Sequence, residues 1–240
     1  MFRGFVCILF LCLDVVLLLP VALIGALVSL FGKDRQRRYY RAFVRWALKV
    51  IAKISGARLS VTGAEGFKDG DSYLFAGNHQ SYFDIVLAYR YLPEPTFFVV
   101  KDEFKRIPLL GFLAKRIGCL FIDREDPRKA MKTIVEATAI LKENRGSVFI
   151  YPEGTRSRDG LIHEFHSGSF KAAQKSGAPI IPVAAYGTRE VWENHLSRLY
   201  PAPVKLSFLP PVNYPELSPD EKKHIGEHVR SLIEKSKERG

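Results

Sequence analysis

Residues 73–91 read Tyr-Leu-Phe-Ala-Gly-Asn-His-Gln-Ser-Tyr-Phe-Asp-Ile-Val-Leu-Ala-Tyr-Arg-Tyr, and this stretch decides the fold. The apolar run Tyr73–Ala76 predicts a buried strand that ends at the glycine after it. A helix is predicted over Ser81–Tyr91, stopped by Pro93. A strand that enters a helix through a short polar loop is the repeating unit of an α/β sheet, and that loop is where such a sheet presents its chemistry.

The alternation of strands and helices continues on both sides of this stretch. Further strands are predicted over Leu59–Val61, Thr96–Val100, Cys119–Ile122, Ser147–Tyr151, Ile180–Ala185 and Val204–Phe208. Further helices are predicted over Glu103–Arg116, with breaks at Pro108 and Gly111, and over Ser169–Lys175, which ends before Gly177. Another is predicted from the N-cap Asp126 to Lys142, with Gly146 beyond its end, and a last one from Ser218 onward. The pattern predicts an α/β fold in which a central mixed, largely parallel sheet carries helices on its faces. Residues 56–240 are expected to form one domain.

The N-terminus is a separate segment, apolar from Phe5 to Phe31 except for Asp14 and Pro20. About 20 apolar residues are enough to cross a bilayer, so one spanning helix is one interpretation. A bent pair of helices in one leaflet is the other, because a charge and a proline both disfavour a straight span. A cleaved signal peptide fits less well, because its apolar region is only about 7–15 residues long.

Basic residues follow at once, in the order Lys33, Arg35, Arg37, Arg38 and Arg41. Beyond them, Phe43, Val44, Trp46, Ala47, Val50, Ile51 and Ile54 recur at helical spacing, with Arg45, Lys49 and Lys53 between them. A basic amphipathic helix of this kind lies in a membrane interface, although an ordinary helix with a solvated face has the same pattern. Residues 1–55 are therefore interpreted as membrane-anchoring helices. If the apolar segment spans the bilayer, the basic cluster and the domain after it are expected on the cytoplasmic side.

The composition is that of a globular protein, and its positive charge fits either an anionic partner or a generic basic surface. The chain has 240 residues, 47% hydrophobic and 25% charged, and a net charge of +11. Such a charge suits nucleic acid, an acidic membrane or a phosphorylated substrate, and does not choose among them. Three cysteines, with no Cys-x-x-Cys and no Cys/His cluster, favour neither a disulfide framework nor a zinc site, so no metal is expected.

His79 and Asp84 form the candidate catalytic pair. On a continuous helix, residues five apart point about 140° away from each other and do not meet. With His79 in the loop and Asp84 in the first helical turn, the carboxylate can reach back and orient the imidazole as a base. The alternative is that Ser81-x-x-Asp84 is a capping box and Asp84 only caps backbone amides.

No protein nucleophile accompanies this pair. The sequence has no Gly-x-Ser-x-Gly, no Walker A motif and no Gly-x-Gly-x-x-Gly. A base without a protein nucleophile points to deprotonation of the substrate itself, with a substrate hydroxyl as the nucleophile.

Cations follow three of the predicted strands. Arg156 stands in Tyr151–Ser157, Arg124 ends the segment Phe121–Arg124, and Lys101 ends a third strand. Arginine binds phosphate through paired hydrogen bonds, so the three could share one anion if these strand ends lie together. The alternatives are local ion pairs: Arg156 with Glu153, and Arg124 with Asp123 as a surface pair worth about 0–1 kcal/mol.

Four segments in this order resemble the glycerolipid acyltransferase family and, within it, the bacterial enzymes that acylate 1-acylglycerol 3-phosphate. The segments are Asn78-His79-x4-Asp84, Phe121-Ile-Asp-Arg124, Glu153-Gly-Thr-Arg-Ser157 and Ile180-Ile-Pro-Val183. Each segment alone is weak, but four in order are specific, and they span residues 78–183.

The resemblance implies a set of roles. His79 would be the general base and Asp84 its partner; Arg124 and Arg156, with Lys101 as a weaker candidate, would bind the acceptor phosphate; Glu153, Gly154 and Thr155 would shape the acceptor site; Ile180–Val183 would line or support the donor pocket. The acceptor would be lysophosphatidic acid and the product phosphatidic acid. The co-substrate would be acyl-CoA or acyl-acyl carrier protein (acyl-ACP), with no cofactor.

The resemblance also implies a location and partners. The enzyme would work among membrane lipids at the cytoplasmic face of a bacterial inner membrane, with no nucleic acid partner. Two alternatives stay open: the same chemistry on glycerol 3-phosphate, another lysophospholipid or an aminolipid, or a non-enzymatic, membrane-tethered anion-binding protein.

Overall fold

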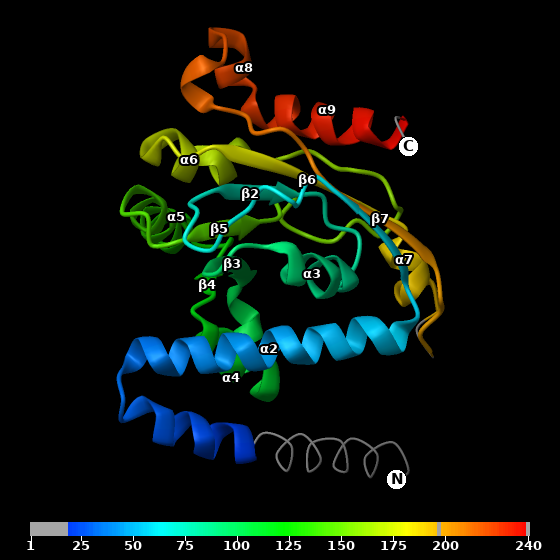
Figure 1. Ribbon diagram of the computed structural model, residues 1–240. Helices are drawn as coiled ribbons and strands as arrows, with labels where there is room; N and C mark the ends of the chain where they lie inside the picture. The colour runs from blue at the N-terminus through cyan, green and yellow to red at the C-terminus, as the bar shows by residue number, and fades with distance from the viewer. Residues whose placement is uncertain (1–18, 196–197, 239–240) are drawn as a thin grey trace.

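The computed structural model describes residues 19–195 and 198–238, which contain a seven-stranded sheet (Figure 1). Its strands are β1 (Arg58–Thr62), β2 (Leu74–Gly77), β3 (Thr96–Lys101), β4 (Leu120–Ile122), β5 (Ser147–Ile150), β6 (Ile180–Tyr186) and β7 (Pro203–Phe208). Their spatial order is β1-β7-β6-β2-β5-β3-β4, and each neighbouring pair is parallel except β6 and β7. The predicted mixed, largely parallel sheet is confirmed.

Helices cover both faces of this sheet. The α-helices are α2 (Lys33–Ser55), α3 (Phe83–Ala88), α4 (Pro108–Ile117), α5 (Pro127–Lys142), α6 (Lys171–Ser176), α7 (Thr188–Val191), α8 (Pro219–Lys223) and α9 (Ile225–Glu238). Short 3-10 helices are η1 (Tyr89–Tyr91), η2 (Asp102–Arg106), η3 (Ser167–Phe170), η4 (Glu193–His195) and η5 (Tyr214–Glu216). A further helical stretch over residues 19–29 precedes α2 and lies alongside it (Figure 1).

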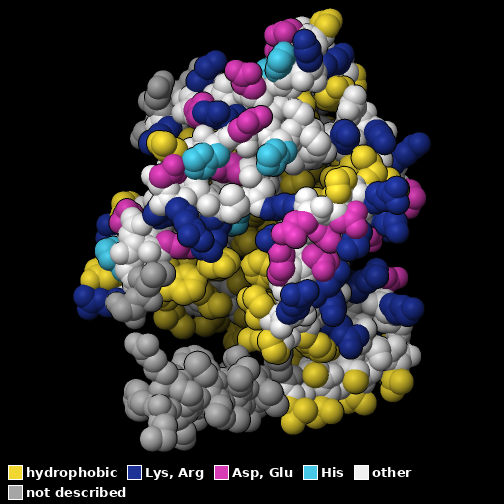
Figure 2. Space-filling view, turned by 180° about the vertical axis from the view of Figure 1, so that it is seen from behind, with side chains coloured by type: hydrophobic (Ala, Val, Ile, Leu, Met, Phe, Trp, Pro, Cys, Tyr) yellow, Lys and Arg dark blue, Asp and Glu magenta, His cyan; other side chains and the backbone are white. Residues whose placement is uncertain are grey.

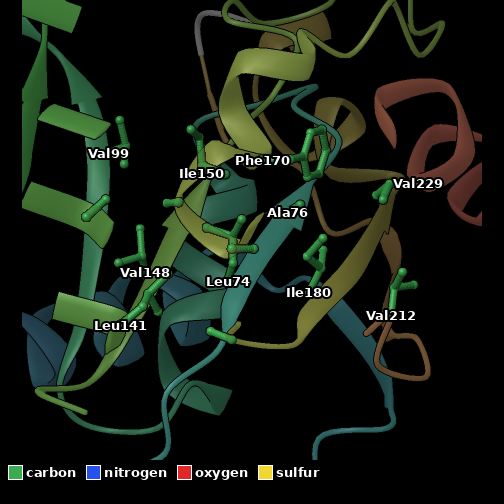
Figure 3. Packing of buried hydrophobic residues seen from close by; sticks show 14 of the residues in the cluster. Leu74, Ala76, Val99, Leu141, Val148, Ile150, Phe170, Ile180, Val212 and Val229 are labelled. Atoms are coloured by element: carbon green, nitrogen blue, oxygen red, sulfur yellow. The ribbon is translucent and has the colours of Figure 1, made fainter. Parts of the chain in front are cut away.

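Alternation along the central strands separates two cores. In β2, Leu74 and Ala76 face α5, α6 and α9, and Phe75 faces the side of α2 and α3. The same alternation holds in β5, where Val148 and Ile150 join the first core (Figure 3) and Phe149 the second. Because side chains of a strand alternate between faces, a continuous apolar run marks a strand buried on both sides. This explains why these two strands read as unbroken hydrophobic segments.

Most predicted elements are confirmed, and their ends differ for local reasons. The helix predicted from Ser81 begins at Phe83 and tightens into η1 at Tyr89. The predicted break at Pro108 is present between η2 and α4, but a break at Gly111 is wrong. Gly111 lies inside α4, where a Cβ would stand 2.7 Å from the Lys105 carbonyl oxygen, so its role is close packing on η2.

Helix α2 is amphipathic, but one predicted surface cation has another role. Trp46 and Ile54 are 61% and 72% exposed. Arg45, in contrast, turns toward the domain: its Nη2 atom lies 2.9 Å from Glu94 Oε1 and 3.0 Å from the Leu92 carbonyl oxygen. Buried Arg41 lies beside it, 3.9 Å from the other Glu94 oxygen. These contacts fix α2 to the domain.

The exposed apolar side chains gather on α2 and on the stretch before it. Leu23, Leu27, Leu30 and Phe31 are all exposed. Figure 2 shows hydrophobic side chains along the lower right edge of the molecule, beneath Lys and Arg side chains. Among the described residues, no helix has both the length and the apolar content needed for a membrane crossing. The start of the apolar segment, residues 5–18, lies outside the described residues.

Candidate active site

The parallel strands β2, β5, β3 and β4 bring their carboxyl ends to one edge of the sheet. Loops at these ends carry the predicted residues. A cavity of about 230 Å³ is lined by His79, Lys101, Arg124, Gly154, Thr155 and Arg156, together with Tyr82, Ile85, Val99, Val100, Phe104 and Tyr151. The candidate base and all three predicted cations therefore share one cavity.

The predicted His–Asp contact is formed. His79 Nδ1 lies 2.9 Å from Asp84 Oδ2, and the same oxygen accepts from the backbone N–H groups of Gln80 at 2.7 Å and Ser81 at 2.8 Å. Asp84 thus both orients the histidine and caps the turn, so the two interpretations of its role are compatible. A carboxylate at Nδ1 favours the tautomer with the proton on that nitrogen, which leaves Nε2 free to accept a proton.

Backbone contacts hold His79 in place from two directions. The Asn78 side chain donates to the Ala185 carbonyl at 2.9 Å and accepts from its N–H at 2.8 Å, which ties the loop to β6. The His79 N–H donates to Glu153 Oε1 at 2.7 Å, and the His79 carbonyl accepts from the Ser157 N–H at 2.8 Å. The two motif loops therefore form one hydrogen-bonded unit.

Glu153 is placed differently from its neighbours Gly154 and Thr155, which line the cavity. Its buried carboxylate accepts from the N–H groups of His79 and His163. Burial raises the pKa of this carboxyl, and the two N–H groups oppose that rise. The geometry makes Glu153 a link between loops.

Tyr151 is a site residue that the sequence analysis missed. Its ring stacks on the imidazole of His79, with centroids 4.0 Å apart and planes inclined by 21°. The side chain is buried, and its hydroxyl has no hydrogen-bond partner among the described residues. Burial, with a contribution from the charge of Asp84, raises the pKa of Tyr151 well above its usual value. The only signal in the sequence was its place at the end of an apolar strand.

Arg156 is held by Tyr82, from the first motif segment, and by Glu193, which lies outside all four motif segments. Its Nη1 atom lies 3.3 Å from Glu193 Oε1, and its guanidinium carbon lies 3.7 Å from the centre of the Tyr82 ring. The alternative pairing with Glu153 is therefore not formed. Glu193 lies 37 residues further along the chain, so local spacing gave no sign of this contact.

The other two cations, Arg124 and Lys101, differ in whether an acidic side chain pairs with them. The alternative pairing of Arg124 with Asp123 is not formed, because Asp123 binds Lys129 at 3.0 Å, and Arg124 has no ion pair with any described residue. Burial lowers the pKa of Arg124. Lys101 binds the exposed Glu103 at 2.6 Å. A guanidinium that lines the cavity and has no ion pair among the described residues is the cavity's best-placed group for an anion.

A second, more apolar groove of about 380 Å³ adjoins the cavity, and both are lined by Val99, Arg124, Tyr151 and Gly154. Its remaining walls include Ile122, Pro127, Ala130, Met131, Ile134, Ile150 and Pro152, most of them from β4, α5 and β5. The segment Ile180–Val183, expected to line or support the donor pocket, lies in the middle of the sheet, where Ile180, Ile181 and Val183 are buried. It supports the site through the 3.3 Å bond from the Asn78 N–H to the Val183 carbonyl.

Chemically, the cavity combines an oriented imidazole with fixed cations. Among residues 19–195 and 198–238, no three His, Cys, Asp or Glu side chains are grouped so as to hold a metal ion. The arrangement can remove a proton from a bound hydroxyl while holding an anionic group nearby.

The known proteins that this chain resembles are acyltransferases. The sequence profile of a family described as acyltransferase matches residues 58–186. The 1-acyl-sn-glycerol-3-phosphate acyltransferase of Escherichia coli is 36% identical over 169 residues, which are 69% of this chain and 68% of that protein. The plant enzyme of the same name from Limnanthes douglasii is 32% identical over 183 residues, 76% of this chain and 63% of the relative.

A solved structure is similar over nearly the whole length. The crystal structure of the 1-acyl-sn-glycerophosphate (LPA) acyltransferase from Thermotoga maritima superposes with a TM-score of 0.71, covering 96% of each chain. Sequence identity is 24%, so this similarity shows only that the two chains share a fold.

Proposed function

The chain belongs to the acyltransferase family, and from this premise we propose that it acylates the sn-2 hydroxyl of lysophosphatidic acid, giving phosphatidic acid. The acyl donor in this proposal is a thioester, acyl-CoA or acyl-ACP, and no resident cofactor takes part. The observation that carries the proposal is the shared cavity of His79, Arg124 and Arg156.

The base in this proposal is His79. Its Nε2 atom takes the proton of the acceptor hydroxyl as the hydroxyl oxygen attacks the thioester carbonyl carbon. The tetrahedral intermediate collapses by breaking the C–S bond, and the thiolate leaves with the proton that His79 carries. A thiol pKa near about 8.5 makes this a good leaving group, so no acyl-enzyme is needed. The 2.9 Å contact with Asp84 supports the role, because a carboxylate stabilises the imidazolium that forms.

The acceptor phosphate is assigned to Arg124 and Arg156, with Lys101 as a third contact. Arg124 lines the cavity and has no ion pair among the described residues, and Arg156 keeps donors free beyond its contact with Glu193. Arginine offers five N–H donors in a planar fork that matches phosphate oxygens. Gly154 and Thr155 complete the wall around this phosphate.

The apolar groove beside Arg124 is proposed to hold the hydrocarbon chain of a substrate. Its side chains Ile122, Met131 and Ile134 offer the apolar contact that a hydrocarbon chain needs. The groove reaches the catalytic cavity at Gly154, whose φ of 78° belongs to the left-handed region that favours glycine. A Cβ there would lie 3.3 Å from Arg124 Nη1 and crowd the passage between the two cavities.

Residues 1–55 are proposed to hold the enzyme at the cytoplasmic face of a bacterial inner membrane, and residues 56–240 to form the catalytic domain. The exposed side chains Leu27, Phe31, Trp46 and Ile54 support an apolar contact with lipid. Cationic residues around them suit the anionic phosphates of the interface.

An acceptor panel tests the proposed reaction. Purified protein in detergent receives a labelled acyl thioester with lysophosphatidic acid, glycerol 3-phosphate or 1-monoacylglycerol. We expect the highest kcat/KM on lysophosphatidic acid, because only that acceptor has both a phosphate and an acyl chain. A preference for another acceptor would replace lysophosphatidic acid and keep the chemistry. Binding of anionic lipid without turnover on any acceptor would favour the non-enzymatic alternative.

A further inference from the structure

Glu193 makes more contacts to the site than its position suggests. It lies in η4, beyond the residues that match the family profile, and its side chain is only 14% exposed. Its Oε2 atom accepts from the Ser81 hydroxyl at 2.6 Å. Its Oε1 atom accepts from the Tyr82 N–H at 2.8 Å and from Arg156 Nη1 at 3.3 Å. One carboxylate thus connects the turn that follows His79 with a cation of the cavity.

The same contacts define the orientation of the Arg156 guanidinium. Glu193 accepts a hydrogen bond from Arg156 Nη1, and the Tyr82 ring lies against one face of the guanidinium, with its centre 3.7 Å from the guanidinium carbon. Tyr82 is itself packed against Trp192, with ring centroids 5.8 Å apart. A guanidinium held by one nitrogen and one face has its plane fixed, while its other N–H groups stay available to a ligand.

We infer that Glu193 is a positioning residue for the acceptor phosphate and acts through Arg156. This inference rests on the proposed function and adds to it a residue outside the four motif segments. An arginine free to rotate loses side-chain entropy when it binds phosphate, whereas one that is already oriented loses less. Glu193 thus reduces the side-chain entropy that Arg156 loses on binding phosphate, and the proton transfer remains the role of His79.

The opposite effect of Glu193 is also physically reasonable and makes the inference testable. A carboxylate 3.3 Å from Arg156 partly neutralises the cation and could weaken phosphate binding. We expect orientation to dominate, because Arg124 supplies an unneutralised guanidinium in the same cavity. The two effects predict opposite changes in acceptor affinity when Glu193 is removed.

The test compares Glu193→Ala, Arg156→Ala and the double variant on lysophosphatidic acid and on 1-monoacylglycerol. We expect Glu193→Ala to raise the KM for lysophosphatidic acid by about tenfold, the scale of one hydrogen bond to a charged group. The change in kcat should be smaller, and 1-monoacylglycerol should show little change. In the Arg156→Ala background the second substitution should add less than about twofold, because coupled residues are not additive.

Two further variants separate positioning from folding. Glu193→Gln keeps an oxygen for the Tyr82 N–H and for Arg156, so it should recover most of the acceptor affinity. Glu143→Ala is the matched control, because Glu143 is 60% exposed and pairs with Arg145 before the start of β5, at the opposite end of that strand from the cavity. It should behave as wild type, and the melting temperature of each variant confirms folding.

Three results would overturn the inference: a lower KM in Glu193→Ala, multiplicative losses in the double variant, or equal losses on both acceptors. The failure of the proposed function has a different signature. In that case wild type itself would not prefer lysophosphatidic acid over 1-monoacylglycerol, and the inference would fall with the function.

Discussion

At the residue scale, the chemistry depends on one oxygen atom. Asp84 Oδ2 accepts from His79 Nδ1 and from two backbone N–H groups, whereas Oδ1 has no hydrogen-bond partner among the described residues. An asparagine with its oxygen in the Oδ2 position therefore preserves all three hydrogen bonds and removes the charge, and it places its NH2 group where Oδ1 has no partner among the described residues. Position 84 thus allows electrostatic support to be separated from capping.

We predict that Asp84→Asn lowers kcat by about 10- to 100-fold, because a neutral partner stabilises the imidazolium less than a carboxylate does. The KM for lysophosphatidic acid should change little. Steady-state kinetics, with a melting curve for each protein, provide the measurement. Full activity in Asp84→Asn would reduce Asp84 to a helix-turn cap.

Tyr151 gives a second prediction at this scale. Its hydroxyl is buried without a partner among the described residues, while its ring supports the imidazole. Tyr151→Phe keeps the ring and removes an unpaired polar group, so stability should rise by up to about 1–3 kcal/mol and activity should be retained. Urea unfolding and kcat measure the two effects. A large loss of kcat would show that the hydroxyl takes part in the reaction.

Residues of the cavity were predictable where they lie in a motif segment or at the end of a predicted strand. The sequence pointed to His79, Asp84, Arg124 and Arg156, because each ends a strand or follows one closely. It gave no sign of Glu193, since a contact between loops far apart in the chain depends on the assembled sheet. Long-range contacts of this kind are fixed by tertiary structure and leave no local spacing to detect.

At the element scale, cap and breaker chemistry decided which boundaries were predictable. Helix α5 begins after Asp126, whose side chain accepts from the N–H of Arg128 and Lys129, and it ends at Lys142 as predicted. The last predicted helix divides into α8 and α9 at His224, and α7 was not predicted. A four-residue helix such as α7 is too short to show a periodic pattern, so its sequence carries little signal.

Attachment of α2 to the domain gives the prediction at this scale. Glu94 is the counter-charge of Arg45 and of buried Arg41, whose pKa burial lowers while Glu94 opposes the shift. Glu94→Gln leaves buried Arg41 without its counter-charge and weakens the contact with Arg45, so it should reduce the free energy of unfolding by about 1.5–3 kcal/mol. Urea unfolding provides the measurement.

The matched control is Glu143→Gln, which removes an exposed pair with Arg145 and should change stability by about 0.5 kcal/mol or less. Equal stability of wild type and Glu94→Gln would contradict this account of how α2 is held.

At the scale of the whole molecule, the fold places a polar cavity and an apolar groove at one edge of the sheet, and it exposes a separate apolar surface on α2. The α/β class and the largely parallel sheet followed from the alternation of strands and helices. Convergence of three cations did not, because it requires the spatial order of β2, β5, β3 and β4. That order is set by packing between segments, which the sequence does not display.

Membrane contact through α2 gives the prediction at this scale. In a Trp192→Phe variant, Trp46 is the remaining tryptophan, and it is 61% exposed on α2. On vesicles with anionic lipid whose chains carry bromine, its fluorescence should be quenched. The control is a protein that lacks Trp46 and Trp192 and carries Val135→Trp on α5, on the other face of the sheet. The fluorescence of that tryptophan should not be quenched. Unquenched Trp46 would contradict an interfacial α2.

The central claim is that His79 is the base of an acyl transfer. The measurement is transfer from a labelled acyl thioester to lysophosphatidic acid in detergent, with wild type and folded His79→Ala side by side. We predict that wild type forms phosphatidic acid and that His79→Ala is slower by at least about 10²–10⁴-fold. Equal product from the two proteins would contradict the His–Asp mechanism and leave the pair a structural role.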